Sequence, residues 1–346
     1  MSAVPETVLK EGVPMSAVWM IHTHGDPLGA VRQLLQGIWQ NASLEGMLVP
    51  VYLSGGPGSS ARLVVSPEQL IEADPCVPLV PVNAAKLVIL QALEAPGRRY
   101  AAVLRSCESR ALVEINKRQE LDLSNWLKIG IDCLASYPRQ DFAWRVERAG
   151  SIEDLTRENL SHARQGGVAA HRYRHACQMC THSAAQDSDV CICLLGLPVK
   201  NVILIQVSDP AIAARLRLDE ITDGEAEAGL LAQHEQMVAM LNERHLHTMD
   251  RMMQDLDKEL PANVDELISH LEDCGPCRQA LDACPIYGLE LARSESGEAI
   301  SRAAAIRWLV SCVSCGMCEQ AVPNHLPLPA IIKRINQESK SELVAA

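Results

Sequence analysis

The sequence predicts an α/β domain with a mostly parallel sheet over roughly the first two thirds of the chain, followed by a helical, cysteine-rich domain. Three observations lead to this prediction. Short apolar segments alternate with helical patterns as far as residue 207, one long helical pattern rich in Met and charge follows, and two tight groups of cysteines lie near the C-terminus. Strands that alternate with helices favour a parallel sheet covered on both faces.

The elements of the first domain follow from its apolar runs. Buried strands are predicted at residues 17–22, 46–53, 100–106, 126–134 and 202–207. Helices are predicted between them at residues 27–40, 84–93 and 108–119, and Asp26 before Pro27 is typical of a helix start. The stretch 54–61 (SGGPGSSA) is expected to be a loop, and it lacks the Gly-Lys-Ser/Thr of a phosphate-binding loop.

A change in character near residue 222 is the predicted domain boundary. Residues 1–222 would form the α/β domain, residues 223–262 a long connecting helix that Pro261 ends, and residues 263–346 the helical domain. One face of the connecting helix carries His234, Met237, Met240 and His245. Their helical spacing is expected to reflect ordinary packing rather than haem binding.

The composition excludes several classes of function. The 346 residues include 43 acidic and 31 basic side chains, with a net charge of −12, whereas binding to a nucleic-acid backbone needs clustered Lys and Arg. No apolar run reaches the ~18 residues of a membrane span, and the first residues lack the basic and apolar regions of a signal peptide. We therefore expect a cytoplasmic protein.

The chain contains 13 cysteines, which in a reducing compartment indicate metal ligands or redox groups rather than disulfides. The C-terminal groups are CGPCRQALDACP (274–285) and CVSCGMCEQAVP (312–323). They are similar in spacing to the ferredoxin run C-x2-C-x2-C-x3-C-P, in which the cysteine before proline binds the other cluster. One complete set for a 4Fe-4S cluster results: Cys284, Cys312, Cys315 and Cys318. A zinc site is the alternative.

The complementary ferredoxin set is incomplete. Ala280 and Val322 stand where its other two cysteines belong, so that only Cys274 and Cys277 remain. Two thiolates alone are not expected to hold a cubane, and the sequence therefore predicts one cluster in this domain. Cys274 and Cys277 could be structural thiols, zinc ligands or a redox dithiol.

A second group of cysteines is dispersed along the α/β domain. Cys107 and Cys133 each follow a predicted strand, and the ends of neighbouring parallel strands meet at one edge of a sheet. The Cys177–Cys180 pair could join them there as a second four-thiolate set. Spacing alone leaves a rival set open, consisting of Cys177, Cys180, Cys191 and Cys193. The last two also fit alternate positions of an apolar strand.

Three segments occur in a specific order: THGDPLGAVRQLLQGIWQNASLEGMLVP, YAAVLRSCESRALVEINKRQ followed by LKIGIDCL, and RHACQMCTHSAAQDSDVCICLLG. In this order they resemble the beta subunits of deazaflavin-coenzyme-reducing hydrogenases and formate dehydrogenases, over roughly residues 15–215. RSCESR departs from the Gly-x-Pro-Cys-Gln form of the hydrogenase branch and looks closer to the formate dehydrogenase branch. Residues from about 265 to 330 resemble the helical ferredoxin domain of heterodisulfide-reductase-type subunits.

The resemblance implies an FAD and a 4Fe-4S cluster in the α/β domain, in addition to the C-terminal cluster. The cluster ligands carried over by position are Cys107, Cys133, Cys177 and Cys180. The flavin pyrophosphate needs backbone donors and cations, for which the candidates are His24, Gly25, Asn83, Lys86, Ser106, Arg110 and Lys117.

The resemblance also implies an electron-transfer oxidoreductase subunit that works inside a complex. Its expected partners are a molybdenum or tungsten formate dehydrogenase subunit or a hydrogenase subunit, other iron–sulfur subunits, and a deazaflavin or nicotinamide hydride carrier. Two other classes stay open. One is an iron–sulfur adaptor without its own flavin, and the other is a zinc-stabilised interaction protein.

Overall fold

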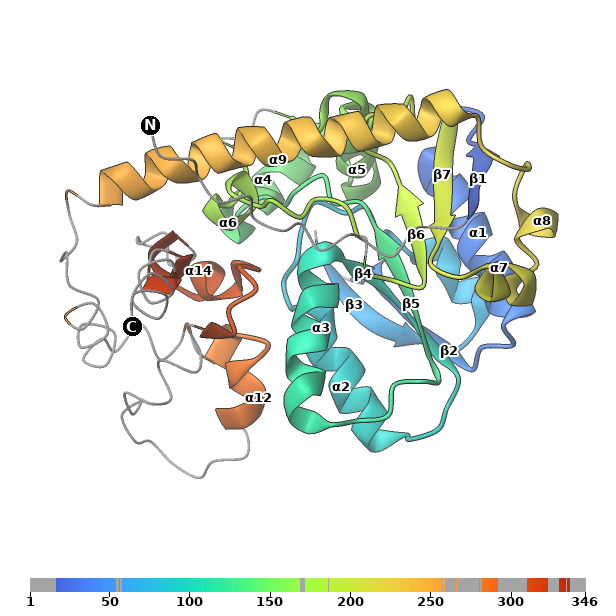
Figure 1. Cartoon of the computed structure of the whole chain (residues 1–346), viewed down its shortest axis with the longest axis horizontal. Coiled ribbons are helices and arrows are strands. Elements are labelled where there is room, and N and C mark those ends of the chain that lie inside the picture. The colour runs from blue at the N-terminus through green and yellow to red at the C-terminus, as the bar shows by residue number, and fades with distance from the viewer. Residues whose placement is uncertain are drawn as a thin grey trace, which may run out of the picture.

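The computed structural model describes residues 17–53, 56, 58–168, 172–185, 187–256, 258, 266, 280, 282–291, 310–322, 330–333 and 335–336. A seven-stranded sheet lies at the centre of these residues, in the order β1-β7-β6-β5-β4-β2-β3 (Figure 1). Its strands are β1 (Ala17–His22), β2 (Gly46–Tyr52), β3 (Ser59–Val64), β4 (Tyr100–Arg105), β5 (Trp126–Ile131), β6 (Val190–Cys193) and β7 (Val202–Val207).

The sheet is mixed. Strands β2, β4, β5 and β6 pair in parallel, while β3 and β7 run antiparallel to their neighbours. Since β1 pairs antiparallel with β7, it points the same way as the parallel core. The predicted common strand direction is therefore confirmed for five described strands, and the antiparallel pairings lie on the two sides of that core. The loop predicted at residues 54–61 was wrong for its last three residues, because strand β3 begins at Ser59. Ser59 pairs with Tyr52 of β2.

Helices cover both faces of the sheet. One face carries α1 (Pro27–Asn41), α7 (Pro210–Leu216) and α8 (Leu218–Ile221), and the other carries α2 (Ala84–Glu94) and α3 (Ser106–Gln119). Strand β4 shows why: Ala101 and Val103 pack into the first core, whereas Ala102 and Leu104 pack into the second. Alternate residues of a strand point to opposite faces, so a strand covered on both sides is apolar throughout.

The structure describes eight further helical elements. They are η1 (Pro67–Glu72), α4 (Arg139–Ala149), α5 (Ile152–Ser161), η2 (Ala163–Gln165), α6 (His175–Gln178), α9 (Ala228–Leu256), α12 (Tyr287–Leu291) and α14 (Met317–Ala321). Helix α9 crosses the edge toward which β6 points and continues toward the C-terminal segments (Figure 1). Among the described helices, none has both the length and the apolar character that a membrane crossing requires.

Helix α9 lies within residues 223–262, where the sequence predicts a long connecting helix. Its buried side chains recur at helical spacing and include His234, Leu241 and His245. Met240, by contrast, is 54% exposed, so the predicted His and Met face does not form one continuous buried stripe. The two histidines are buried by packing against the sheet edge and the loop at Cys180, to which His245 is hydrogen-bonded.

Candidate metal centres

Two neighbouring strands bring Cys107 and Cys133 to one edge of the sheet. Strands β4 and β5 pair in parallel, with Arg105 opposite Ile131 at their carboxyl ends. Cys107 lies two residues beyond Arg105, in the first turn of α3, and Cys133 lies two residues beyond Ile131. The two cysteines thus occupy equivalent positions after adjacent strands, which is the placement that the sequence predicted.

The C-x2-C pair completes a group of four thiols. Cys107, Cys133, Cys177 and Cys180 line a single cavity. Backbone hydrogen bonds fix the segment that carries the pair: Cys133 N–H donates to the Ser183 carbonyl at 2.8 Å, and Arg174 N–H donates to the Ser136 carbonyl at 3.0 Å. We call this the edge cavity. Helix α9 forms one of its walls through Leu241, Arg244 and His245.

The rival cysteines Cys191 and Cys193 lie elsewhere, in strand β6. Both are buried, and neither lines the edge cavity. Cys191 Sγ donates to the Ala185 carbonyl, and Cys193 Sγ donates to Gln206 Oε1 at 3.5 Å. The structure therefore brings Cys177 and Cys180 together with the strand-end cysteines rather than with the C-x-C pair.

Two buried arginines line the edge cavity and form no direct ion pair with a carboxylate among the described residues, although Asp74 attracts Arg105 and Glu319 attracts Arg174 from a longer distance. Arg105, 5% exposed, donates to the Val77 and Leu79 carbonyls and to Ser136. Arg174, 2% exposed, donates to Cys177 Sγ at 3.4 Å, and its Nε and Nη1 atoms have no partner. Burying a cation without compensating negative charge is costly. The cavity is therefore suited to an anionic centre such as a metal bound by several thiolates.

Three thiols of the edge cavity, those of Cys107, Cys133 and Cys180, have a raised pKa and hold their protons more tightly than an ordinary cysteine. Burial raises the pKa of Cys107 well above its ordinary value, and Glu108 adds to this effect. Burial also raises the pKa of Cys133 to about 12 and raises the pKa of Cys180. A coordinated metal stabilises thiolates strongly enough to displace such protons. The group thus fits structural metal ligands better than free reactive thiols.

The C-terminal cysteines form a second group. Cys284, Cys312, Cys315 and Cys318 line one cavity, which we call the C-terminal cavity. Ser314 N–H donates to Cys312 Sγ at 3.3 Å, and burial raises the pKa of Cys312 to about 11 and that of Cys315 to about 12. Cys274 and Cys277 lie outside the described residues, so the prediction that they hold no cluster stays a prediction.

The two cavities share a wall. Ser314 and Cys315 line both of them. The segments that carry the cysteines are also tied together, because Glu319 accepts hydrogen bonds from the backbone N–H groups of His175 and Ala176 at 2.9 and 3.1 Å. The same carboxylate lies 3.1 Å from His175 Nδ1. Groups bound in the two cavities would therefore be neighbours.

A third cavity, of about 380 Å³, lies beside both cysteine groups. Cys180 and Cys312 line it together with Arg110, His182 and Lys333. Neither Arg110 nor Lys333 has an ion pair within the described part of the chain, and Arg110 Nε is buried without a hydrogen-bond partner. The pKa of His182 is lowered to about 4 by burial and by these two cations. This basic cavity is suited to an anionic group.

The residues predicted to contact a flavin do not converge. His24 and Gly25 follow β1, at one end of the strand order, whereas Arg110 lies on α3 beside the cysteines. Lys117 is exposed and forms an ion pair with Glu114 at 2.6 Å. The other three lie near the starts of α2 and α3: Asn83, which caps α2, Lys86 and Ser106. The structure thus leaves Arg110 as the candidate that lies near both cysteine groups.

Sequence reasoning did not anticipate Arg105, Arg174 and Glu319. Each lies within three residues of a cysteine ligand candidate, and that proximity was the available signal. Charged residues next to such cysteines are more often exposed, so burial of the two arginines could not be read from the sequence.

No family model matches the chain. Among solved structures, the chain is similar to a chain of the F420-reducing NiFe hydrogenase complex from Methanosarcina barkeri, with a TM-score of 0.49 and 11% identity over 69% of this chain and 92% of that one.

Proposed function

We propose that this chain is an electron-transfer subunit of an oxidoreductase complex and that it binds two 4Fe-4S clusters. One cluster would be held by Cys107, Cys133, Cys177 and Cys180, and the other by Cys284, Cys312, Cys315 and Cys318. The observation that carries the proposal is the edge cavity, where four half-buried cysteines meet two buried arginines that form no ion pair with a carboxylate among the described residues. A cubane bound by four thiolates supplies negative charge and one-electron chemistry there.

The shared wall supports a relay between the two centres. Cys315 belongs to the C-terminal ligand set and also lines the edge cavity. Electron transfer between protein-bound clusters requires close approach, and adjacent cavities provide it. The residues of this chain would hold the two centres side by side, shield them from water, and set their potentials through nearby charge and hydrogen bonds.

The test is a measurement of iron, acid-labile sulfide and zinc on protein purified without oxygen. We expect about eight irons and eight sulfides per chain. Cys177→Ser should remove about four irons, and Cys318→Ser about the other four. Cys76→Ser is the matched control, because Cys76 is a half-buried thiol in neither set, and it should keep all eight. Zinc without sulfide would overturn the proposal.

A flavin is the second part of the proposal. The basic cavity favours it, because a flavin dinucleotide carries a pyrophosphate that the two cations of this cavity, Arg110 and Lys333, could bind beside both cysteine groups. A bound FAD would exchange hydride with a deazaflavin or nicotinamide carrier and pass single electrons onward. The scattered positions of the other flavin candidates favour the alternative, an iron–sulfur adaptor without flavin.

Released flavin decides between these two forms. About one FAD per chain beside eight irons would support the flavoprotein, and Arg110→Gln should then lower flavin occupancy without loss of iron. Eight irons with no flavin, in protein that is also unable to bind added FAD, would leave the adaptor. In either form the partner would be a catalytic formate dehydrogenase or hydrogenase subunit. Co-purification of a tagged chain from its native cells tests that expectation.

A further inference from the structure

Helix α9, which runs along the top of the molecule in Figure 1, carries a groove on one of its faces. The groove has a volume of about 560 Å³, and the short element η2 forms its second wall through Arg164 and Gln165. Most of the helix residues recur every three or four positions and therefore share one face. They are Met237, Met240, Leu241, Glu243, Arg244, His247 and Arg251. We call this the helix groove.

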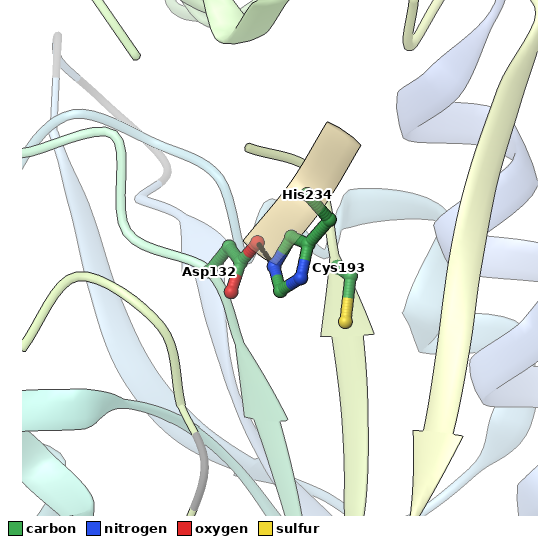
Figure 2. A group of neighbouring side chains, drawn as sticks. All are labelled: Asp132, Cys193 and His234. Carbon is green, nitrogen blue, oxygen red and sulfur yellow. Dashed lines mark hydrogen bonds and ion pairs between the residues drawn. The ribbon is translucent and has the colours of Figure 1, made fainter. Parts of the chain in front are cut away.

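Polar contacts hold the opposite, buried side of α9 in place. His234 Nε2 lies 2.9 Å from Asp132 Oδ2, in the loop after β5, and Figure 2 shows the two side chains pointing toward each other. Further along the helix, His245 Nδ1 lies 2.5 Å from the Cys180 carbonyl oxygen. A surface that is already held in its shape loses little conformational entropy when a partner binds to it.

The second wall of the groove is fixed as well. Gly166, directly after η2, packs so closely on α9 that a Cβ there would lie 2.8 Å from Leu241 Cδ2. The two walls of the helix groove therefore keep a constant separation.

The floor of the helix groove is apolar. Met240 is 54% exposed, Met237 is half-buried beside it, and Leu241 is buried beneath them. Single exposed apolar side chains are common on protein surfaces and indicate nothing by themselves. Methionine is, however, enriched at protein interfaces, where its flexible thioether adapts to the partner.

The rim of the helix groove is basic. Arg164, Arg244 and Arg251 are exposed, and within the described part of the chain none of them forms an ion pair. Glu243, the carboxylate in the groove lining, lies 4.0 Å from His247 Nε2 instead. Three guanidinium groups around an apolar floor are a departure from the rest of this chain, which has a net charge of −12. The complementary surface is an apolar stripe flanked by carboxylates.

We propose that the helix groove binds an acidic amphipathic helix of a partner subunit. From Met237 to Arg251 the groove follows α9 for roughly 21 Å, which is the length of about four helical turns. The apolar stripe of the partner helix would pack on the methionine floor, as amphipathic helices do in other grooves. Its flanking carboxylates would pair with the three arginines, whose planar groups suit carboxylates well.

The position of the groove gives this contact a role. Leu241 and Arg244 line the helix groove and also the edge cavity. A partner helix docked there would lie one helix away from the proposed edge cluster. The inference rests on the proposed function in this role and in the expectation of a complex, but the contact itself does not require bound iron.

The test is photo-cross-linking of the full-length, tagged chain in its native cells. The cross-linking amino acid p-benzoylphenylalanine replaces Met240, and in the matched control it replaces Leu246, which is 44% exposed on the same helix but lies outside the groove. Mass spectrometry of the cross-linked peptides identifies the contacting segment. We expect an acidic amphipathic helix of another protein at position 240, with a yield about tenfold lower at position 246.

Three results would overturn the proposal: no cross-link at position 240, a cross-link to a segment without flanking carboxylates, or a cross-link to a second copy of this chain. Charge reversal gives an independent reading. The double variant Arg164→Glu with Arg251→Glu should lower the yield at position 240 by about tenfold, because it replaces attraction with repulsion. Arg215→Glu, at an exposed position of α7, should leave the yield unchanged. An equal yield in the double variant would contradict the proposed basic rim.

Iron measured in the same samples separates this inference from the proposed clusters. An iron-loaded chain that gives no cross-link would overturn the docking proposal alone. A chain that gives the expected cross-link without iron would overturn the clusters and leave the docked helix.

Discussion

The edge cavity and the C-terminal cavity each bring together a set of four candidate ligand thiols, but the two cavities differ in construction. The edge cavity collects its cysteines from two strand ends and a distant C-x2-C pair, and two buried arginines line it with them. The C-terminal cavity is lined by cysteines, small residues and apolar side chains such as Ile286 and Ile332, with no charged side chain among its described lining residues. Similar ligand sets therefore lie in different electrostatic surroundings, one with cations in its lining and one without charged lining residues.

The comparison indicates that the spacing of the cysteines along the sequence does not determine the reduction potential of the cluster they would bind. Adding an electron to a cluster makes it more negative, so nearby cations favour the reduced state. We therefore expect the edge cluster to have the higher reduction potential of the two. An electron would then be more stable on the edge cluster than on the C-terminal cluster.

The largest effect should come from removing one ligand on either side. Cys133→Ser should abolish the edge cluster, with loss of about four irons, and leave the EPR signal of the C-terminal cluster in place. Cys312→Ser should give the opposite pattern. If either variant lost all its iron, the two centres would not be separable units and the comparison would fail.

Removing a buried charge should have the next largest effect. Arg174→Gln deletes a cation that contacts Cys177. At an effective dielectric of about 20, one charge a few ångströms away contributes a few kcal/mol, or on the order of 100 mV. We expect the potential of the edge cluster to fall by this order in an EPR-monitored titration, and that of the C-terminal cluster to fall less. Arg172→Gln, at an exposed position, should change neither potential.

The contact between the two cysteine segments can be tested at Gly316. This residue has a φ of +71°, and a Cβ there would lie 2.5 Å from Ala176 Cβ. Gly316→Ala should lower the free energy of unfolding by roughly 2–3 kcal/mol through strain and overlap. Gly97→Ala is the control, because its φ is +81° but its Cβ would meet nothing within 4 Å. Thermal unfolding should show a clearly smaller loss for Gly97→Ala, and equal losses would contradict a tight contact.

A smaller effect is expected at Glu319, which holds the start of α6. Glu319→Gln keeps the shape of the side chain but removes the negative charge that faces the His175 ring. It also weakens the hydrogen bonds that the carboxylate accepts from the backbone N–H groups of His175 and Ala176. We expect a loss of about 1 kcal/mol and faster proteolysis near residue 319. Glu114→Gln, at a carboxylate paired with Lys117 on the surface of α3, should cost less than about 0.5 kcal/mol.

The sheet and its cysteine edge were predictable because their signals are local. Strands buried on both faces appear as apolar runs, and Cys107 and Cys133 follow such runs directly. Strand β3 was missed because Ser59, Ser60 and Arg62 interrupt its apolar pattern and a Gly-rich stretch precedes it. An edge strand that is open to solvent on one side carries a weak signal of this kind.

The surroundings of the candidate metal ligands could not be predicted in the same way. His234 meets Asp132 across 102 residues, and Glu319 meets His175 across 144. Such pairings depend on how α9 and the C-terminal segments lie over the sheet, which no local pattern specifies. Buried Arg105 and Arg174 are a similar case, because arginine ordinarily lies at the surface.

The shared wall also has a consequence for biogenesis. Cys107, Cys133 and the Cys177–Cys180 pair are all synthesised before Ser314 and Cys315, which close the edge cavity on one side. Residues 175 and 319 are 144 positions apart, so at roughly 5–20 residues per second the closing segment follows about 7–30 s later. During that interval the edge cavity is open to a cluster-delivery protein. We therefore expect the two proposed clusters to be inserted in a fixed order. The edge cluster would be inserted first, before the C-terminal segment docks against the edge cavity.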